Sequence, residues 1–446
     1  MHISRRQFMV GCSAAIAGMA GARLNGMIFD QEAPSAHAAG SNTILLMIFL
    51  RGGCDGLSLV SPYTDGTYRA ARGGLTVNTP LDLTVNNGGF FASGVATTGF
   101  GLHPGAAQLK ALYDSGDLAI VHACGLNDDT RSHFDAMDYI ERGTPGNKNT
   151  GSGWLTRHLN CVNVGGTLPT MSAGSSTPAS LLADTKAVSM YSADSYDLST
   201  PGWRYGSGGN DAMFTTLEKL YGGSGLAVPA GKRTVETIKA LKSATKYEPV
   251  GYPNSSFANS LKTVAQVMKL DIGMRVATVD LGGWDHHENQ GVNGGTFANL
   301  ATALSDGLAA FYNDVASYRD RLVVVVQSEF GRRLGANQSQ GTDHGHGGVM
   351  LVLGGQVNGG KLYGSWPGLE DLDQSQDLKI TTDYRSVLGE VVVRQLGNNK
   401  IGTVFPGITP QIYKPLNIVG TSANDPATLD FTSAQHQVFL PQARSS

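Results

Sequence analysis

The sequence Gly341-Thr342-Asp343-His344-Gly345-His346-Gly347-Gly348 stands between two apolar runs, residues 322–326 and 349–353, that are typical of buried strands. One carboxylate and two imidazoles lie within four residues, in a setting too rich in glycine for a helix. Glycine lets the backbone turn sharply and approach a ligand closely, and Asp and His supply donors to a divalent metal. The stretch indicates either a metal or catalytic loop between two strands or a polar turn.

Length and composition narrow the class of protein. The chain has 446 residues, 41% hydrophobic and 15% charged, with a formal net charge of −3. This length supports a sizeable core, in one large α/β domain or two smaller ones. Near-neutral charge without a basic block argues against nucleic acid or an anionic membrane surface as partners. With 59 glycines and 17 prolines, many loops and tight turns are expected instead of a helical bundle.

The first forty residues carry the features of a targeting segment. Ser4-Arg5-Arg6-Gln7-Phe8-Met9 is similar to the twin-arginine export signature, and Ala36-His37-Ala38 fits a small-x-small cleavage pattern. We therefore expect a signal peptide over residues 1–38, transport by the twin-arginine translocase, and a periplasmic or secreted mature protein. Arg23 and Asp30 interrupt the apolar run, which is far shorter than the ~20 residues that a span needs, so no stable membrane span is expected.

The cysteines argue against two further classes of protein, those held together by a disulfide framework and those with a redox centre bound by cysteines. Cys54, Cys124 and Cys161 remain after cleavage, an odd number that indicates no disulfide framework, and all three are expected to be reduced and buried. The chain has no Cys-x-x-Cys and no cysteine spacing of haem or iron–sulfur type, so a redox protein of these kinds is not supported.

Five apolar runs predict the strands of a mostly parallel central sheet with helices on both faces: residues 43–50, 118–123, 275–279, 322–326 and 349–353. Helical periodicity is expected from His103 to Ser115 and over residues 257–269, 297–315 and 384–396. Residues 147–253 lack this alternation, and we expect an insertion or cap over the sheet edge that shapes substrate access. One domain would then cover residues 39–446.

Polar side chains gather where these strands end: Asp55, then Asp285 and His287, then Glu329, and finally Asp343, His344 and His346. Because successive strand ends of a parallel sheet lie along one edge, we expect these groups to converge. Mixed carboxylates and imidazoles suit zinc, manganese or a similar divalent ion, bound singly or as a pair. For Asp55, a role in capping a turn stays open.

A hydroxyl nucleophile is suggested by the sequence from Asn127 to Asp135, which leads into a predicted helix. A hydroxyl at a helix amino terminus lies in a favourable dipole field, where phosphate or sulfate also binds. This field lowers the cost of an alkoxide, especially beside Arg131 or a metal. Ser132 with Asp135 three residues later is equally a capping-box pattern, so both roles stay open.

Five motifs carry a family resemblance: Leu50-Arg-Gly-Gly-Cys-Asp-Gly-Leu57, Arg131-Ser-His-Phe134, Gly282-Gly-Trp-Asp-His-His287, Ser328-Glu-Phe-Gly-Arg332 and Gly341-Thr-Asp-His-Gly345. With them the chain resembles the domain of unknown function 1501 family, exported bacterial proteins that are grouped with the alkaline phosphatase superfamily. The resemblance covers essentially the whole mature chain and implies an alkaline-phosphatase-like α/β fold.

The order of functional groups in that superfamily implies roles for residues of this sequence. Asp55 matches the first metal ligand, and Ser132 or Thr130 matches the nucleophile at a helix start. Asp285 and His287 match an Asp/His pair, although the superfamily usually has three residues between the two.

The last ligands follow further along the chain. The resemblance implies Glu329 or Asp343 with His344 as the next pair, and His344 or His346 as the final ligand. Whether one metal or two would bind stays open at this point.

We therefore expect an exported α/β hydrolase with divalent Zn or Mn that cleaves a phosphate or sulfate ester of a small molecule or polymer. Ser132 or Thr130 would attack, and Arg131 would steady the oxyanion. The alternative is a non-catalytic exported protein of the same fold that binds a carbohydrate or cell-envelope partner. The irregular Asp/His spacing favours this alternative. The convergence of ionisable groups favours the enzyme, because burying them costs stability unless a metal pairs them.

Overall fold

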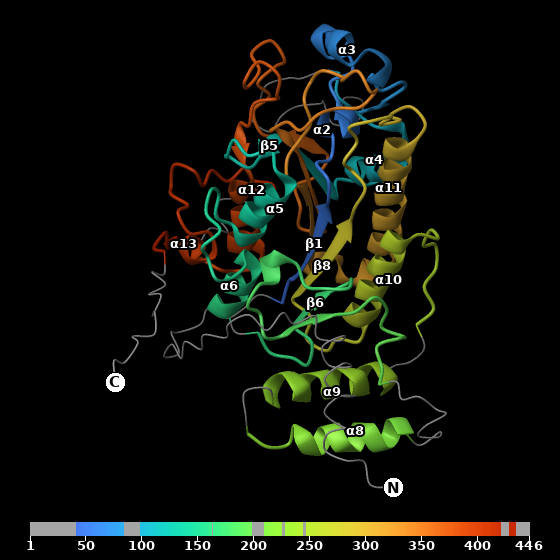
Figure 1. The fold of residues 1–446 in the computed structure, drawn as a ribbon, viewed down its shortest axis with the longest axis vertical. Coiled ribbons are helices and arrows are strands. Elements are labelled where there is room, and N and C mark those ends of the chain that lie inside the picture. The colour runs from blue at the N-terminus through green and yellow to red at the C-terminus, as the bar shows by residue number, and fades with distance from the viewer. Residues whose placement is uncertain are drawn as a thin grey trace, which may run out of the picture.

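A computed structural model describes residues 42–83, 99–162, 164–198, 209–224, 228–243, 247–420 and 428–433 (Figure 1). The expected signal peptide, residues 1–38 with its twin-arginine motif, lies outside the described residues. Within them, no helix is both long and apolar enough to cross a membrane.

A nine-stranded sheet forms the centre of the molecule, in the order β11-β5-β10-β9-β1-β8-β6-β7, with β12 also paired to β5. Its strands are β1 (Ile44–Leu50), β5 (Leu118–Gly125), β6 (Thr170–Ser172), β7 (Ala187–Ser189), β8 (Val276–Leu281), β9 (Leu322–Ser328), β10 (Gly348–Leu353), β11 (Lys361–Tyr363) and β12 (Thr382–Asp383). All five predicted strands are present, and their bounds differ from the predicted ones by only one or two residues. The predicted mostly parallel α/β sheet is confirmed.

One strand runs against the others. β10 pairs antiparallel with both β5 and β9, whereas the other described pairs of this sheet are parallel. Its amino end therefore lies at the edge where β1, β8 and β9 have their carboxyl ends. The loop of residues 341–347, which enters β10, is thereby brought to the edge that carries the other candidate ligands.

Burial on both faces explains the continuous apolar runs. Alternate residues of β1 enter separate clusters: Ile44, Leu46, Ile48 and Leu50 belong to one, and Leu45, Met47 and Phe49 to the other. The first cluster includes residues of α4 (Ala107–Asp114), α10 (Ser256–Lys269) and α11 (Thr296–Asp314). The second includes residues of α5 (His133–Arg142), α6 (Trp154–Cys161), α12 (Tyr384–Glu390) and α13 (Ile401–Val404). Figure 1 shows these two groups on opposite sides of the sheet.

Shorter elements complete the described chain. They are α2 (Gly56–Leu59), α3 (Gly66–Arg72), a small sheet of β2 (Val60–Ser61), β3 (Leu81–Asp82) and β4 (Gly101–Leu102), and 3-10 turns at Gly73–Leu75, Pro104–Ala106, Ala179–Leu181 and Ala316–Arg321. The helix predicted from His103 begins as one of these turns and continues as α4. The predicted closing helix, residues 384–396, ends as a π-helical turn over Val391–Gln395. Cys54, Cys124 and Cys161 are buried, as predicted, and none of them forms a disulfide within the described residues.

The segment 147–253, predicted as an insertion or cap, contributes more to the sheet than expected. Its strands β6 and β7 extend the central sheet beyond β8. Its helices α8 (Gly209–Leu220) and α9 (Val228–Ser243) lie near the amino ends of β1 and β8, at the end of the molecule away from α2 and α3 (Figure 1). These two helices therefore do not cover the edge where the candidate ligands gather. The boundaries of the insertion stay a prediction.

His122 in β5 shows how the core constrains a titratable side chain. The residue is fully buried, its Nδ1 lies 2.9 Å from the amide nitrogen of Ala123, and its Nε2 lies 2.9 Å from the carbonyl oxygen of Val60. Since Nδ1 faces an N–H donor, the proton of the neutral ring is carried on Nε2. Burial lowers the pKa of His122 to about 4, because the charged imidazolium would lose its hydration.

This pKa predicts a pH dependence of stability. The folded pKa lies below the ordinary value of 6.5, so between these values the unfolded chain binds more protons and the free energy of unfolding falls as the pH falls. The contribution of His122 is at most about 3 kcal/mol. We expect the free energy of unfolding, measured with urea, to fall less for His122→Gln than for the unsubstituted protein when the pH is lowered from about 7.5 to about 4.5. Equal losses in the two proteins would contradict this account.

Candidate metal centre

Side chains from three distant segments meet at the carboxyl edge of the sheet. His133 is the first residue of α5, Asp285 and His287 follow β8, and His344 lies in the loop that enters β10. His133, Asp285 and His344 offer ligand atoms that all lie within 4.8 Å of one another. His287 joins them through short contacts to Asp285 and His344.

The three distances from Oδ1 of Asp285 are close to those between ligands of one metal ion, whereas one imidazole-to-imidazole distance is shorter. Oδ1 of Asp285 lies 3.4 Å from Nε2 of His133, 3.1 Å from Nε2 of His287 and 3.4 Å from Nε2 of His344. The Nε2 atoms of His287 and His344 are 2.8 Å apart. Tetrahedral coordination with metal–ligand bonds of 2.0–2.1 Å separates the ligand atoms by roughly 3.3 Å. The carboxylate-to-imidazole distances match this value.

The opposite nitrogen of each imidazole is engaged by an oxygen. Nδ1 of His133 lies 2.7 Å from Oε1 of Glu329, and Nδ1 of His287 lies 3.1 Å from Oδ1 of Asp343. Nδ1 of His344 lies 2.7 Å from the backbone carbonyl oxygen of Arg131. Such partners accept a hydrogen bond from Nδ1–H, which fixes the ring orientation and leaves the lone pair of Nε2 free for a metal. Glu329 and Asp343, predicted as ligands, contact these imidazoles through Nδ1 in the structure, and their roles as ligands stay predictions.

Arg332 fixes the position of the carboxylate ligand. Its buried guanidinium donates a hydrogen bond of 2.7 Å to Oδ1 of Asp285. Partial burial would raise the pKa of Asp285, but this hydrogen bond, the charge of Arg332, and nearby His133 and His287 lower it to about 2. The carboxylate is therefore ionised at neutral pH, the form that binds a cation.

Three further pKa shifts accompany this arrangement. Burial would raise the pKa of Glu329, but hydrogen bonds from His133 and from the amides of Gly52 and Gly53 lower it. The hydrogen bond to Glu329 raises the pKa of His133, while burial lowers that of His344. His344 is thus kept neutral at pH 7.

The cluster is open on one side. The side chains of Asp285 and His287 are 49% and 41% exposed, whereas those of His344 and His133 are 20% and 19% exposed. A catalytic metal site keeps a position accessible to water or substrate, unlike a closed structural site. The exposed side around Asp285 and His287 provides such access.

Two predicted ligands lie elsewhere. Asp55 is buried and forms a two-point ion pair with Arg72, and Ser58 and Gln290 donate further hydrogen bonds of 2.6 and 2.7 Å to Oδ2. The oxygens of Asp55 thus accept four hydrogen bonds from protein side chains, and its role as a metal ligand stays a prediction. His346 is also buried, with Nδ1 at 2.5 Å from Oδ2 of Asp373, away from the other imidazoles.

The sequence analysis missed His133. It lies inside the stretch that was interpreted as a nucleophile site, directly after Ser132. The available signal was a further imidazole at the end of a strand-to-helix loop, the same position in the fold as the other ligands. The neighbouring hydroxyl of Ser132 favours the prediction of a nucleophile at this stretch, so His133 is not predicted as a ligand.

The predicted catalytic residues, Thr130, Arg131 and Ser132, lie directly before the first residue of α5. Oγ of Ser132 accepts a hydrogen bond of 3.4 Å from the amide of Asp135 and caps the helix, and Oγ1 of Thr130 accepts one of 3.2 Å from the amide of Ser132. Arg131 donates to Oδ2 of Asp377 at 2.5 Å and to Gln374 at 2.9 Å. In the described part of the chain, neither hydroxyl contacts the four ligands by a hydrogen bond.

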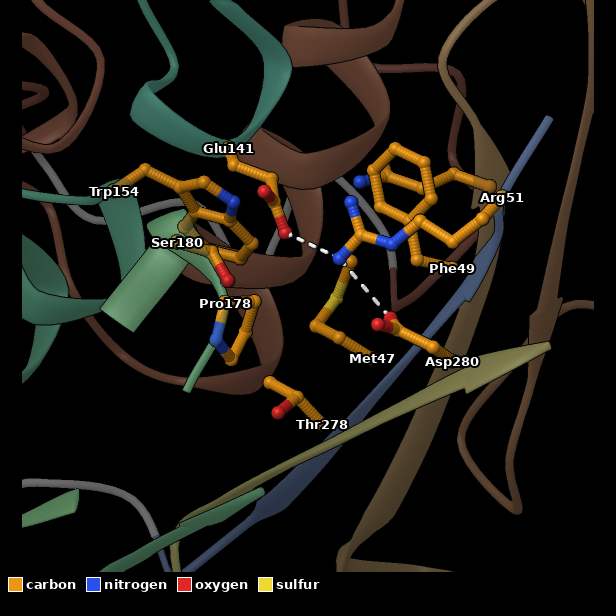
Figure 2. Close-up of a pocket in the computed structure, with 10 residues that line it drawn as sticks. Met47, Phe49, Arg51, Glu141, Trp154, Pro178, Ser180, Thr278 and Asp280 are labelled. Atoms are coloured by element: carbon orange, nitrogen blue, oxygen red, sulfur yellow. Dashed lines mark hydrogen bonds and ion pairs between the residues drawn. The ribbon is translucent and has the colours of Figure 1, made fainter. Parts of the chain in front are cut away.

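A separate pocket lies against the middle of the sheet (Figure 2). Arg51 enters it and bridges Oε1 of Glu141 at 2.8 Å and Oδ1 of Asp280 at 3.0 Å. Trp154 and Pro178 line it as well. The guanidinium is thus already neutralised by two carboxylates, which makes this pocket a poor site for an anionic ligand.

The fold and the cluster together define an α/β protein with a candidate metal centre at the carboxyl edge of its sheet. The chain belongs to the family described as Protein of unknown function (DUF1501), whose model matches residues 119–388. This segment contains His133, Asp285, His287 and His344. No curated protein matches the chain.

Several solved structures are distantly similar. Ps i-CgsB in complex with k-i-k-neocarrahexaose is 10% identical, with 85% of this chain and 75% of that chain covered and a TM-score of 0.37. The C-terminal periplasmic domain of EcEptC from Escherichia coli is 11% identical, with 90% and 89% covered and a TM-score of 0.35. Alkaline phosphatase from the Antarctic bacterium TAB5 is 9% identical, with 72% and 94% covered and a TM-score of 0.28.

The cap formed by Ser132 predicts different effects of two substitutions. Ser132→Ala should lower the free energy of unfolding by about 1 kcal/mol, because α5 loses its side-chain cap. Ser132→Asn should retain most of the stability, since Asn caps helices as well as Ser does. Chemical unfolding of the two variants measures this difference, and equal stabilities would show that the cap contributes nothing.

Proposed function

We propose that this protein is an exported metal-dependent hydrolase of phosphate or sulfate esters, with a divalent ion held by His133, Asp285, His287 and His344. The observation that carries the proposal is the common orientation of three imidazoles. Each presents Nε2 to the same carboxylate oxygen of Asp285, at 3.1–3.4 Å, while its Nδ1 is engaged on the other side.

The ring nitrogens of the cluster are better satisfied by a bound cation than by hydrogen bonds among themselves. Nε2 of His133 is buried and has no hydrogen-bond partner among the described residues. The Nε2 atoms of His287 and His344 face each other at 2.8 Å, where only one of them can donate. A divalent ion would accept the Nε2 lone pairs of all three imidazoles and would balance the negative charge of Asp285.

The donor set constrains the ion. Three imidazoles and one carboxylate suit zinc and related transition ions. We therefore propose that the bound ion is Zn or Mn. We propose one ion, because Asp55 and His346 have partners outside the cluster. When bound, the ion would supply a Lewis acid that polarises an oxygen of the ester.

The chain itself supplies the positioning. Glu329 and Asp343 hold two of the imidazoles, and Arg332 holds the carboxylate ligand. Ser132 lies immediately before His133 and Thr130 three residues before it, and both stay the proposed nucleophiles. Ser132 would have to leave its hydrogen bond to the amide of Asp135 in order to attack.

Substrate and location follow from the same proposal. The exposed side of the cluster admits a small-molecule ester or the end of a polymer. Delivery to the periplasm or the medium by the twin-arginine translocase is part of this proposal and is motivated by Arg5 and Arg6 in their sequence context.

A second candidate function is a non-catalytic exported protein that binds a carbohydrate or a cell-envelope partner. One observation favours it: four protein ligands are enough to complete a tetrahedral sphere, as they do in structural zinc sites. The hydroxyls of Ser132 and Thr130 also have local partners in the turn before α5.

Metal content tests the proposed centre. Protein purified without added metal should hold one zinc or manganese ion per chain by elemental analysis. Asp285→Asn combined with His344→Ala should abolish the binding. Glu329→Gln should weaken it on the order of 10- to 100-fold, because it replaces the charged acceptor that orients His133 by a neutral amide. Asp320→Asn, an exposed carboxylate substitution, is the matched control and should bind normally. Stoichiometric metal in the double variant would refute the assignment.

Turnover of p-nitrophenyl phosphate and p-nitrophenyl sulfate distinguishes the two functions. The hydrolase should act on at least one of these esters and should stop after chelation. Metal-loaded protein without turnover of either ester would favour the binding protein. Ser132→Asn keeps the cap but lacks a hydroxyl, so its full activity, together with that of Thr130→Val, would exclude both proposed nucleophiles.

A further inference from the structure

We propose that Phe134 contacts the organic group of the ester and selects substrates in which that group is a ring with an apolar face. This inference rests on the proposed function and names the class of ester that the centre takes. Phe134 is the second residue of α5 and directly follows the ligand His133. It is 82% exposed, so its phenyl ring is available to a bound molecule.

The surface of α5 around this ring is otherwise charged. Asp138 pairs with Arg142 at 2.7 Å, and Asp135 pairs with Lys148. Single exposed apolar side chains are common on protein surfaces. The place of Phe134 beside a metal ligand is therefore what indicates a role.

The helical repeat places Phe134 on the face of α5 that is turned toward β8. Seven residues make about two turns of an α-helix, so Phe134 and Glu141 lie on the same face. Oε1 of Glu141 lies 2.8 Å from Nη2 of Arg51, and the same nitrogen lies 3.0 Å from Oδ1 of Asp280 in β8 (Figure 2). Phe134 is thus on the β8 side of the helix.

The directions of α5 and β8 bring Phe134 to the level of the metal centre. The helix begins at the carboxyl edge of the sheet with His133, and β8 ends at this edge shortly before Asp285. From Glu141 back to Phe134 the helix rises by about 10 Å toward this edge. Phe134 therefore faces the segment that follows β8, on the side where Asp285 is exposed.

That segment leaves room for a ligand. Gly282 and Gly283 are exposed and carry no side chains. Among the described residues, a Cβ added at Gly282 would meet no heavy atom within 4 Å. Asp285 beyond them is 49% exposed. The two glycines thus keep the approach between Phe134 and the centre open.

A phenyl ring at this position favours a particular kind of ester. An ester whose anion binds at the centre would extend its organic group into the open side. Phenylalanine has no polar atom, so it recognises a ring by packing, in an offset-stacked or edge-to-face arrangement, and removes apolar surface from water. A methyl group offers little of this surface. Phe134 would therefore select ring-bearing esters over small alkyl esters.

Isothermal titration calorimetry with the metal-loaded full chain tests this selection. Phenylphosphonate and benzenesulfonate carry the ring, methylphosphonate and methanesulfonate do not, and none has an ester bond to cleave. The unsubstituted protein should bind the ring compound of its preferred anion on the order of 10-fold more tightly than the methyl compound.

Phe134→Ala should remove this preference and leave the affinity for the methyl compound unchanged. Phe134→Tyr should retain it, because the ring is kept. Tyr191→Ala is the matched control. Tyr191 is 69% exposed, and its carbonyl accepts a hydrogen bond from Thr263 of α10, on the face of the sheet opposite α5. This variant should bind like the unsubstituted protein.

Elemental analysis of each variant separates this inference from the proposed function. A ring preference that survives in Phe134→Ala, or equal affinities of the unsubstituted protein for ring and methyl compounds, would overturn the role of Phe134 and leave the metal centre intact. Metal uptake without binding of any of the four anions would do the same. If the unsubstituted protein takes up no metal, both proposals fail together.

Discussion

The candidate site depends on one buried guanidinium. Arg332 donates to the carbonyl oxygen of Gly53 at 2.7 Å, of Thr342 at 2.8 Å and of Trp284 at 3.2 Å, and it also contacts the carbonyl of Gly52. These carbonyls belong to the loops that follow β1, follow β8 and precede β10. The remaining contact is with Asp285. The fixed planar geometry of the guanidinium makes one side chain a template for three loops.

The ion pair between Asp55 and Arg72 also stabilises these loops, through Gln290. Gln290 donates to Asp55 and accepts from Oγ1 of Thr342 at 2.8 Å, two residues before His344. Removing one partner of a buried pair leaves an uncompensated charge, which is far more costly than the pair is favourable. Asp55 is therefore linked through Gln290 to the loop that carries His344, and the antiparallel β10 brings that loop to the edge where Asp285 and His287 lie.

The sequence predicted much of the fold and part of the site, for physical reasons that can be traced. Strands buried on both faces leave continuous apolar runs, so β1, β8 and β9 were predictable. The strands β6 and β7 have only three residues each, too few for such a signal. In the cluster, Asp285 follows the rule that parallel strands present ligands at their carboxyl ends, whereas His344 reaches the same edge because it precedes the antiparallel strand β10. The ion pair of Asp55 with Arg72 was not predictable, because Arg72 comes from the short helix α3, whose packing no local pattern specifies.

The most direct test of the metal centre is X-ray absorption spectroscopy of the purified protein at the edge of the bound metal. The account predicts a first shell of imidazole nitrogens and one carboxylate oxygen at about 2.0–2.2 Å, with the outer-shell scattering of three imidazole rings. A shell of oxygen ligands with at most one imidazole would place the metal elsewhere and would contradict the assignment of His133, His287 and His344.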